Sequence, residues 1–291
     1  MRIATWNVNS LKARLEKLTW WLERTSPDVV LLQETKCADA DAPRDELTKL
    51  GYELAHHGSG GRNGVAIASR APMTDVEVNF GEPLHAATPD APEDPFAEAR
   101  MIAVTVSGLR VASLYVPNGR SLDSPSFGAK LAWFDRLSGW LDAHRDGESI
   151  LLGGDFNVAP ADADVWDPKA SHGGTHVSPK ERAAFARLGA WGLVDAYRKH
   201  HPEPERYTWW DYRAGNFQRN VGMRIDHVLV TAPIASRTVA AEIDREARKG
   251  KPIPSDHAPL VVDLDEPGRA FDAGWSGADE RVAARRAKAK S

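Results

Sequence analysis

The sequence predicts a mixed α/β fold. Short apolar runs recur from the first residues to about residue 264, each followed by turn residues, and amphipathic helical stretches lie between them. The composition is 42% hydrophobic and 27% charged, which is typical of a globular protein. At about 150 residues per domain the length suggests two domains, but a single α/β domain often reaches about 250 residues, so composition alone leaves the domain count open.

The expected elements follow one another along the chain. Leucines at helical spacing predict a helix over residues 11–24, which Ser26 and Pro27 end. Two more helices are expected at residues 127–143 and at residues 179–188, where Ser178 can cap and Pro179 occupies the first helical position. The apolar runs predict strands at 28–32, 64–69, 101–106, 109–115, 149–152, 226–231 and 260–264.

Two segments differ from this pattern. Residues 82–98 carry four prolines among acids and alanines, which predicts a long surface loop. The segment 266–291 has few apolar residues and ends in DERVAARRAKAKS, so we expect a flexible basic tail after a catalytic domain at 1–265. The basic end could contact DNA phosphates, although a solvated tail is the simpler interpretation.

Composition also excludes several classes of protein. The single cysteine, Cys37, rules out an internal disulfide and a multi-cysteine zinc site. No run approaches the roughly 18 apolar residues of a membrane span, and the start MRIATWNVNS lacks the features of a signal peptide, so we expect a soluble cytoplasmic protein with no membrane partner. The net charge of -4 means that a polyanion must meet a local basic patch.

Acids and amides gather at the ends of the predicted strands, where folding alone does not require them. Each has an ordinary explanation by itself, because Asp and Asn favour turns. Together they form a set rich in carboxylate and amide oxygen with one histidine and no cysteine, which suits Mg²⁺ or Mn²⁺ better than zinc. The set comprises Asn7, Glu34, Asp155, Asn157, Asp226, Asp256 and His257.

This inventory indicates a type of chemistry. The sequence has neither a G-x-x-x-x-G-K-[ST] loop nor a G-x-S-x-G elbow, so triphosphate binding and a serine nucleophile have no support. Ser255, Asp256 and His257 cannot form a triad by adjacency, because successive side chains of an extended segment point to opposite sides. Water is then the expected nucleophile, with a metal polarising a phosphoryl oxygen, a carboxylate orienting the water and a histidine stabilising charge. The residues therefore predict metal-assisted hydrolysis of a phosphodiester.

Seven motifs in order carry a family resemblance: TWNVNS, LLQETK, LYVPNG, GGDFNVAP, WWDYR, RIDH and SDHAPL. As a set they resemble the exonuclease III branch of the endonuclease/exonuclease/phosphatase family, which has the deoxyribonuclease I-like fold. The resemblance implies a four-layered α/β sandwich, with two mixed β-sheets packed face to face and helices outside. It also implies a Mg²⁺-dependent enzyme of base-excision repair, with Mn²⁺ able to substitute, and we expect a monomer. Such an enzyme cleaves duplex DNA 5' to abasic sites and removes nucleotides from 3' ends.

The resemblance also implies roles for individual residues. Glu34 would be the main metal ligand, with Asn7 and Asp256 close to the metal. Asp155 would activate water or bind a second metal, and Asn157 would hold the phosphate near the metal. Tyr115 would contact the phosphate or assist proton transfer, and His257, oriented by Asp226, would balance the developing negative charge.

DNA binding needs other residues, because the site itself is acidic. In the loop GSGGRNGVAI, Arg62 and Asn63 are suited to gripping a phosphate backbone, although a simple turn is the alternative. An apolar pocket for a base-less sugar is expected at Trp209, Trp210 and Met223, for which core packing is the alternative. Further candidates for phosphate contact are Lys130, Arg213 and Asn216.

Two other functions stay open at this stage. The same fold could act on another phosphodiester, such as RNA ends, an inositol phosphate or a phospholipid. The chain could also be a catalytically silent DNA-binding module, which would predict the loss of Glu34, Asp155, Asp226 or His257, yet all four are present.

Overall fold

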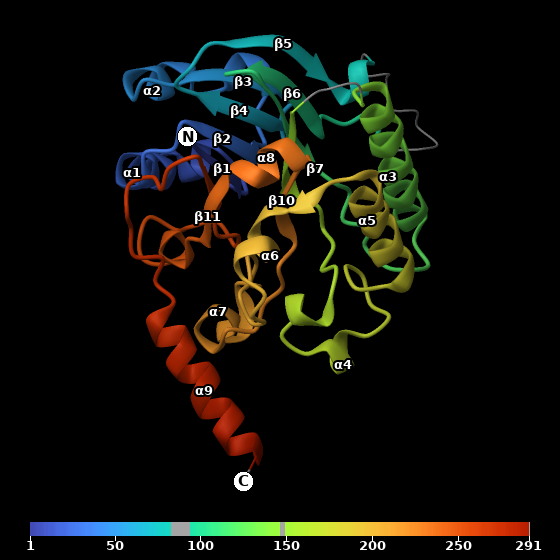
Figure 1. Cartoon of the computed structure of the whole chain (residues 1–291), viewed down its shortest axis with the longest axis vertical. Helices are drawn as coiled ribbons and strands as arrows, with labels where there is room; N and C mark the ends of the chain where they lie inside the picture. Colours follow the sequence, from blue (N-terminus) through green and yellow to red (C-terminus); the bar gives the residue numbers. More distant parts are fainter. Residues whose placement is uncertain (83–93, 146–148, 291) are drawn as a thin grey trace.

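Two six-stranded mixed β-sheets pack face to face, with helices covering the outer face of each (Figure 1). The computed structural model describes residues 1–82, 94–145 and 149–290. The strand order is β11-β12-β1-β2-β4-β3 in the first sheet and β5-β6-β7-β8-β10-β9 in the second. The predicted four-layered α/β sandwich is therefore confirmed.

The bounds of the elements are as follows. The strands of the first sheet are β1 (Arg2–Asn7), β2 (Val29–Gln33), β3 (Glu53–His57), β4 (Val65–Ser69), β11 (Thr238–Ile243) and β12 (Leu260–Leu264). Those of the second are β5 (Met73–Val78), β6 (Met101–Val106), β7 (Leu109–Tyr115), β8 (Ile150–Asp155), β9 (Val194–Asp195) and β10 (Asp226–Val230). The α-helices are α1 (Leu15–Thr25), α2 (Arg44–Lys49), α3 (Pro125–Ala143), α4 (Pro168–Ser171), α5 (Pro179–Trp191), α6 (Ala196–His200), α7 (Asn216–Arg219), α8 (Ala232–Arg237) and α9 (Ser276–Lys290). Short 3₁₀ turns are η1 (Lys12–Arg14), η2 (Asp39–Asp41), η3 (Asn79–Gly81), η4 (Asp162–Asp164), η5 (Arg213–Gly215) and η6 (Arg245–Arg248).

The strands are almost continuously apolar because both faces of each sheet are covered. In β2, Val29 and Leu31 enter the core between the two sheets, whereas Val30 and Leu32 pack under α1. Trp21 of α1 lies edge-on to Trp6 of β1, with ring centroids 5.4 Å apart. On the far side, α3 and α5 cover the second sheet (Figure 1).

Two glycines in β8 allow the strand to reach its position. A Cβ on Gly153 would lie 2.4 Å from Cδ1 of Leu31 in the facing sheet, and a Cβ on Gly154 would lie 1.9 Å from the carbonyl oxygen of Leu114 in β7. Any larger residue would push β8 away from both neighbours. The pair therefore fixes where Asp155, the next residue, emerges from the sheet.

The seven strands and three helices expected from the sequence are all present, with ends shifted by a few residues. Strands β3, β5, β9 and β11 were not predicted. Their sequences mix apolar with charged or small residues, as in MTDVEV of β5, whose central residues are exposed. The expected loop at residues 82–98 lies largely outside the described residues, because 83–93 are not described.

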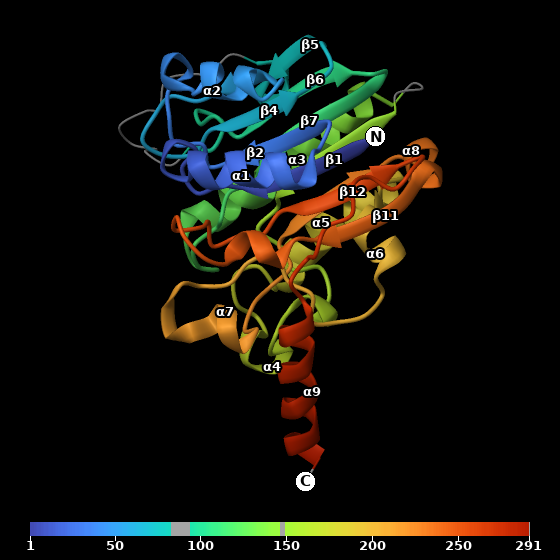
Figure 2. The same cartoon turned by 90° about the vertical axis from the view of Figure 1, so that its left-hand side faces the viewer.

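The expected flexible tail differs from the structure. After residue 265 the chain packs back on the body: Trp275 is 6% exposed, and its indole Nε1–H donates to the carbonyl of Ile243 at 2.7 Å. Ala273 and Ala278 are also buried. Only then does α9 project away from the sheets (Figure 2). The few apolar residues of this segment are thus enough to anchor it, because they meet a preformed surface.

No helix within the described ranges combines the length and apolarity that a membrane crossing requires.

A buried ion-pair network supports the second sheet beside β10. The Arg224 guanidinium, 1% exposed, lies 2.7 Å from Oδ1 of Asp164 and 2.7 Å from Oδ2 of Asp195. Arg198 also pairs with Asp164. Burial alone would raise the pKa of Asp164, but the charges and hydrogen bonds of Arg224 and Arg198 hold it below its usual value. This network therefore stabilises the loop that precedes β10.

We expect Asp164→Asn to lower the free energy of unfolding by about 3 kcal/mol, because it leaves buried guanidinium groups short of a counter-charge. Urea denaturation at pH 7 measures the change. The control is Asp162→Asn, whose carboxylate is 71% exposed and pairs with Arg182; it should cost under about 1 kcal/mol. Because the folded-state pKa of Asp164 is depressed, its contribution should persist above about pH 4 and disappear on further acidification. Equal effects of the two substitutions would contradict this account.

Candidate active site

Strand register brings the predicted polar residues to one edge of the sandwich. The parallel strands β1 and β2 place Asn7 opposite Gln33, next to Glu34. In the second sheet, Tyr115 of β7 and Asp226 of β10 both lie opposite Asp155 of β8. Strand β12 runs antiparallel to β1, so the residues just before Leu260 arrive at the end of β1. Both sheets therefore deliver their polar termini to the same rim.

Asn7 connects the two sheets at this rim. Its Nδ2 donates to Oε1 of Glu34 at 2.8 Å and to Oδ2 of Asp155 at 3.0 Å, while its Oδ1 accepts from the backbone N–H of Asn9 at 3.0 Å. A carboxylate can only accept, so the amide must present its NH₂ group to both acids. Asn7 thus lies beside the two clustered carboxylates, with its oxygen accepting from Asn9, and its place close to a metal stays a prediction.

His257 is held by a buried acid. Its Nδ1–H donates to Oδ2 of Asp226 at 2.8 Å, and its Nε2 lies 3.8 Å from Oδ2 of Asp155. Burial would lower the pKa of His257, but the charges of Asp226, Asp155 and Asp256 raise it to about 10. The ring is therefore an imidazolium at neutral pH, with Nε2–H directed at the centre of the site. For Asp155, burial and the neighbouring acids Asp226 and Glu34 outweigh the attraction of His257 and raise the pKa to about 7.

The donor set fits a hard divalent cation. One ligand atom from each of Glu34, Asp155 and His257 falls within 4.8 Å of the other two. Since a protonated imidazole has no free lone pair, the two carboxylates are the groups that suit a cation here. Glu34 remains 18% exposed, which leaves the pair open to solvent.

Asp256 does not join this group. Its Oδ1 accepts from Nδ2 of Asn9 at 2.9 Å and its Oδ2 from the indole of Trp209 at 3.1 Å. Its expected place close to the metal stays a prediction, since each oxygen accepts a hydrogen bond here but keeps a lone pair. Asp256 orients Trp209 and Asn9.

Lys36 and Asn9 were not predicted from the sequence. Lys36 Nζ lies 2.8 Å from Oε2 of Glu34 and donates to Oδ1 of Asn9 at 2.6 Å, so a chain of contacts runs from Glu34 to Asp256. Asn9 stands two positions beyond Asn7, and Lys36 two positions beyond Glu34. Because Asn9, Glu34 and Lys36 have positive φ angles, these segments are not extended, and the alternation of a strand could not have indicated the contacts.

Asn157 and Tyr115 flank Asp155. The Asn157 backbone N–H donates to Oδ1 of Asp155 at 2.9 Å, and its side-chain Oδ1 accepts from Nδ2 of Asn118 at 3.2 Å. Its amide oxygen thus faces Asn118, and its expected role in holding the phosphate near a metal stays a prediction. Burial, followed by the charge of Glu34, raises the pKa of Tyr115 well above its usual value, so its hydroxyl stays protonated and can donate.

The backbone leaves regular β geometry at the site. Positive φ angles occur at Asn9 (47°), Glu34 (52°), Lys36 (52°) and Asn157 (52°). Such values are unfavourable for residues other than glycine and persist only where the surroundings enforce them, which is common at functional sites.

Two predicted DNA contacts are wrong in position. Lys130 is fully buried; its Nζ pairs with Glu181 and donates to the carbonyl of Asn157 at 2.7 Å, so it supports Asn157 from behind. His176, which we did not predict to act here, donates through Nδ1 to the same carbonyl at 2.6 Å, and burial lowers its pKa to about 4.

Trp210 is the second of these two residues. It is also fully buried and packs against Phe217 and Trp275.

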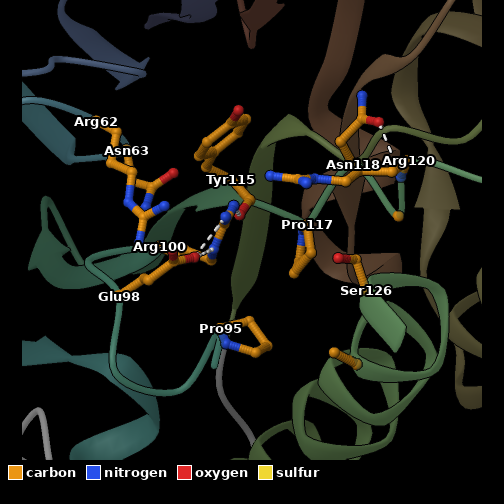
Figure 3. Close-up of a pocket in the computed structure, with 12 residues that line it drawn as sticks. Arg62, Asn63, Pro95, Glu98, Arg100, Tyr115, Pro117, Asn118, Arg120 and Ser126 are labelled. Atoms are coloured by element: carbon orange, nitrogen blue, oxygen red, sulfur yellow. Dashed lines mark hydrogen bonds and ion pairs between the residues drawn. The ribbon is translucent and has the colours of Figure 1, made fainter. Parts of the chain in front are cut away.

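The remaining candidates are at least partly exposed, except Asn63, which is 9% exposed. Arg62 and Asn63 line a cavity of about 200 Å³ beside Tyr115, with Arg100 and Arg120 on its other walls (Figure 3).

Trp209 and Met223 are half-buried and joined by backbone bridges. Arg213 is 87% exposed and pairs with Asp211, and Asn216 is half-buried. These positions leave the predicted DNA contacts open to a ligand.

Comparisons with known proteins agree with this geometry. The model of the Endonuclease/Exonuclease/phosphatase family matches residues 4–257. The chain is 34% identical to Exodeoxyribonuclease III of Haemophilus influenzae, over 91% of this chain and 100% of that protein. Two solved structures, each matching 91% of this chain and 100% of theirs, are similar. One is a 3' phosphatase, NExo, from Neisseria bound to a product DNA hairpin (41% identity, TM-score 0.83), and the other is an AP endonuclease from Archaeoglobus fulgidus (36%, 0.81).

We expect Glu34→Gln to weaken binding of Mg²⁺ or Mn²⁺ by tenfold or more, because it removes one of the two clustered carboxylates. Calorimetric titration of the purified protein measures the dissociation constant. Glu53→Gln, at an exposed position of β3, is the matched control and should bind the ion as the unmodified protein does. Equal affinity in both variants would remove Glu34 from the metal site.

Proposed function

Since the chain belongs to the Endonuclease/Exonuclease/phosphatase family, we propose that it is a metal-dependent nuclease of base-excision repair that hydrolyses phosphodiester bonds in duplex DNA. It removes nucleotides from 3' ends and cleaves 5' to abasic sites. The observation that carries the proposal is the rim where Asn7 holds Glu34 and Asp155 beside the imidazolium of His257. The names of the similar proteins, an exodeoxyribonuclease and an AP endonuclease, support the same substrate class.

The ion we propose is Mg²⁺, with Mn²⁺ as a substitute, held chiefly by Glu34. Bound there, it supplies Lewis-acid polarisation of a phosphoryl oxygen. Asp155 orients the attacking water and takes its proton. His257 donates through Nε2–H to the phosphate and balances the charge that develops in the transition state, while Asp226 keeps the ring oriented. The Tyr115 hydroxyl donates a further hydrogen bond to the phosphate.

The DNA backbone crosses the cavity beside Tyr115, where Arg62 and Asn63 face Arg120 (Figure 3). On the opposite side of the rim, Trp209 and Met223 offer apolar surface next to Asp256 for a sugar without a base. All these residues come from one chain, so a monomer suffices.

The experiment uses a labelled duplex with one abasic-site analogue and an undamaged blunt duplex, each with Mg²⁺ and with chelator. Metal-dependent incision 5' to the lesion, together with a 3'-end ladder on the undamaged duplex, is the expected result. Incision alone would restrict the function to abasic sites, and a ladder alone to exonuclease action. If folded protein cleaves neither duplex, the proposal is rejected. RNA and phospholipid phosphodiesters are then the substrates to test, each with Mg²⁺ and with chelator.

We expect His257→Ala to lower kcat by at least about 100-fold, because it removes a donor that acts on transition-state charge. The Kd for DNA, measured with chelator, should change less than about threefold. Asp226→Asn should lose less activity, since it weakens only the orientation and charge of the ring. His172→Ala, at an exposed histidine, is the control and should leave both quantities unchanged. Parallel losses of binding and turnover in His257→Ala would contradict its assigned role.

A further inference from the structure

A second cavity lies away from the rim, beside α7 and the base of α9. Its volume is about 420 Å³, and its lining is strongly basic. Figure 1 shows α7 next to the start of α9, where the tail leaves the body. The lining residues are Phe217, Gln218, Arg245, Arg248, Lys249, Gly250, Pro254 and Arg281. They differ from those of the cavity beside Tyr115.

Two arginines form the inner wall of this cavity. Arg245 and Arg248 are 2% and 7% exposed, and their guanidinium carbons lie 3.9 and 5.1 Å from the centroid of the Phe217 ring. Arg245 donates to the carbonyls of Phe217 at 2.7 Å and Gly274 at 3.5 Å. Among the described residues, Arg248 donates only to the carbonyl of Trp210, at 3.5 Å.

Most donors of these two groups have no acceptor in the part of the chain that the structure describes. Each guanidinium carries five N–H bonds, whereas the two groups together form three hydrogen bonds with the described residues. The Nε atoms of Arg245 and Arg248 are both buried with no partner. Buried polar groups are normally paired, so unpaired donors in a cavity wall call for an acceptor.

The positive charge is likewise unbalanced. Within residues 1–82, 94–145 and 149–290, no carboxylate forms an ion pair with Arg245 or Arg248, and the nearby acids have other partners: Glu246 with Lys249, and Asp279 with Arg206. Burial and the proximity of Arg281 lower the pKa of Arg245 to about 10. Holding uncompensated cations in a buried site costs stability, which a bound anion would recover.

We propose that this cavity is an anion site that binds a phosphate group. Planar guanidinium forks match the oxygens of a phosphate, and Arg281 adds charge to the lining, whereas the charge of Lys249 is balanced by Glu246. Arg281 comes from the tail, beyond the region of the family match at residues 4–257, so the tail completes the site. The phosphate is either part of a duplex DNA backbone or a free phosphate; only the DNA source rests on the proposed nuclease function.

The first test is thermal unfolding with chelator in increasing inorganic phosphate, with chloride adjusted to constant ionic strength. The Tm should rise with phosphate in the unmodified protein and in Lys49→Gln, a control at an exposed position of α2. Arg281→Gln should weaken the apparent phosphate affinity at least tenfold, and Arg248→Met should abolish this cavity's response. Because Arg281 is exposed, we expect Arg281→Gln to fold. Its phosphate response therefore tests the proposal even if Arg248→Met fails to fold. No phosphate response, or the same response in Arg281→Gln as in the control, would overturn the proposal.

The second test distinguishes the two sources of phosphate. Binding of a long duplex is measured with chelator between 50 and 200 mM salt, roughly the range over which backbone contacts respond strongly. If the site holds a backbone phosphate, Arg281→Gln should weaken binding and lower the salt slope by about one. If it holds free phosphate, DNA binding should be unchanged while the phosphate effect on Tm is lost. The first test needs no DNA, so its failure is distinct from failure of the nuclease proposal.

Discussion

The side-chain amide of Asn7 is the interaction on which the rim depends. It donates to Glu34 from its own sheet and to Asp155 from the other, so a single NH₂ group holds two carboxylates that would otherwise repel each other. Just beneath it, Gln33 Nε2 donates to Thr5 and to Ser113, both at 3.0 Å, which ties the sheets together inside the core. The spacing of the acids is therefore set by how the two sheets pack, and a shift of either sheet would alter the site.

Buried charge is compensated differently at the rim and in the cavity beside α7. At the rim, Asp226 balances His257, and each oxygen of Asp155 accepts a hydrogen bond. Beside α7, by contrast, Arg245 and Arg248 are buried without a pairing acid among the parts of the chain that the structure describes. In the first arrangement the buried histidine has its counter-charge within the protein, and the carboxylates around it leave the site acidic. The second is complete only with an anion, which is the physical basis for separating the two cavities.

The sequence was a good guide to the architecture and to the rim. Polar residues that end apolar strands, such as Asp155 after ILLGG, predicted the edge where the site lies, because strand ends gather wherever the sheets do. It was a poor guide to side-chain direction: Asn7 and Asp256 were placed at the correct edge, but their partners depend on Asn9 and Trp209. The role of Lys130 could not be seen, since its partner Glu181 is distant in sequence. The packing of Trp275 could not be predicted either, because a single aromatic residue in a polar segment does not indicate which surface it will pack against.

The pairing of β1 with β12 has a consequence for how the enzyme is made. Arg2 lies opposite Asp263, so one edge of β1 stays uncovered until a segment about 260 residues later in the sequence has been made. His257 arrives with that same closing segment. During synthesis, Glu34, which follows β2, and Asp155, which ends β8, are therefore made well before His257, the residue that balances their charge. A nascent chain on the ribosome thus has no complete site until the segment around His257 has been translated and has paired with β1.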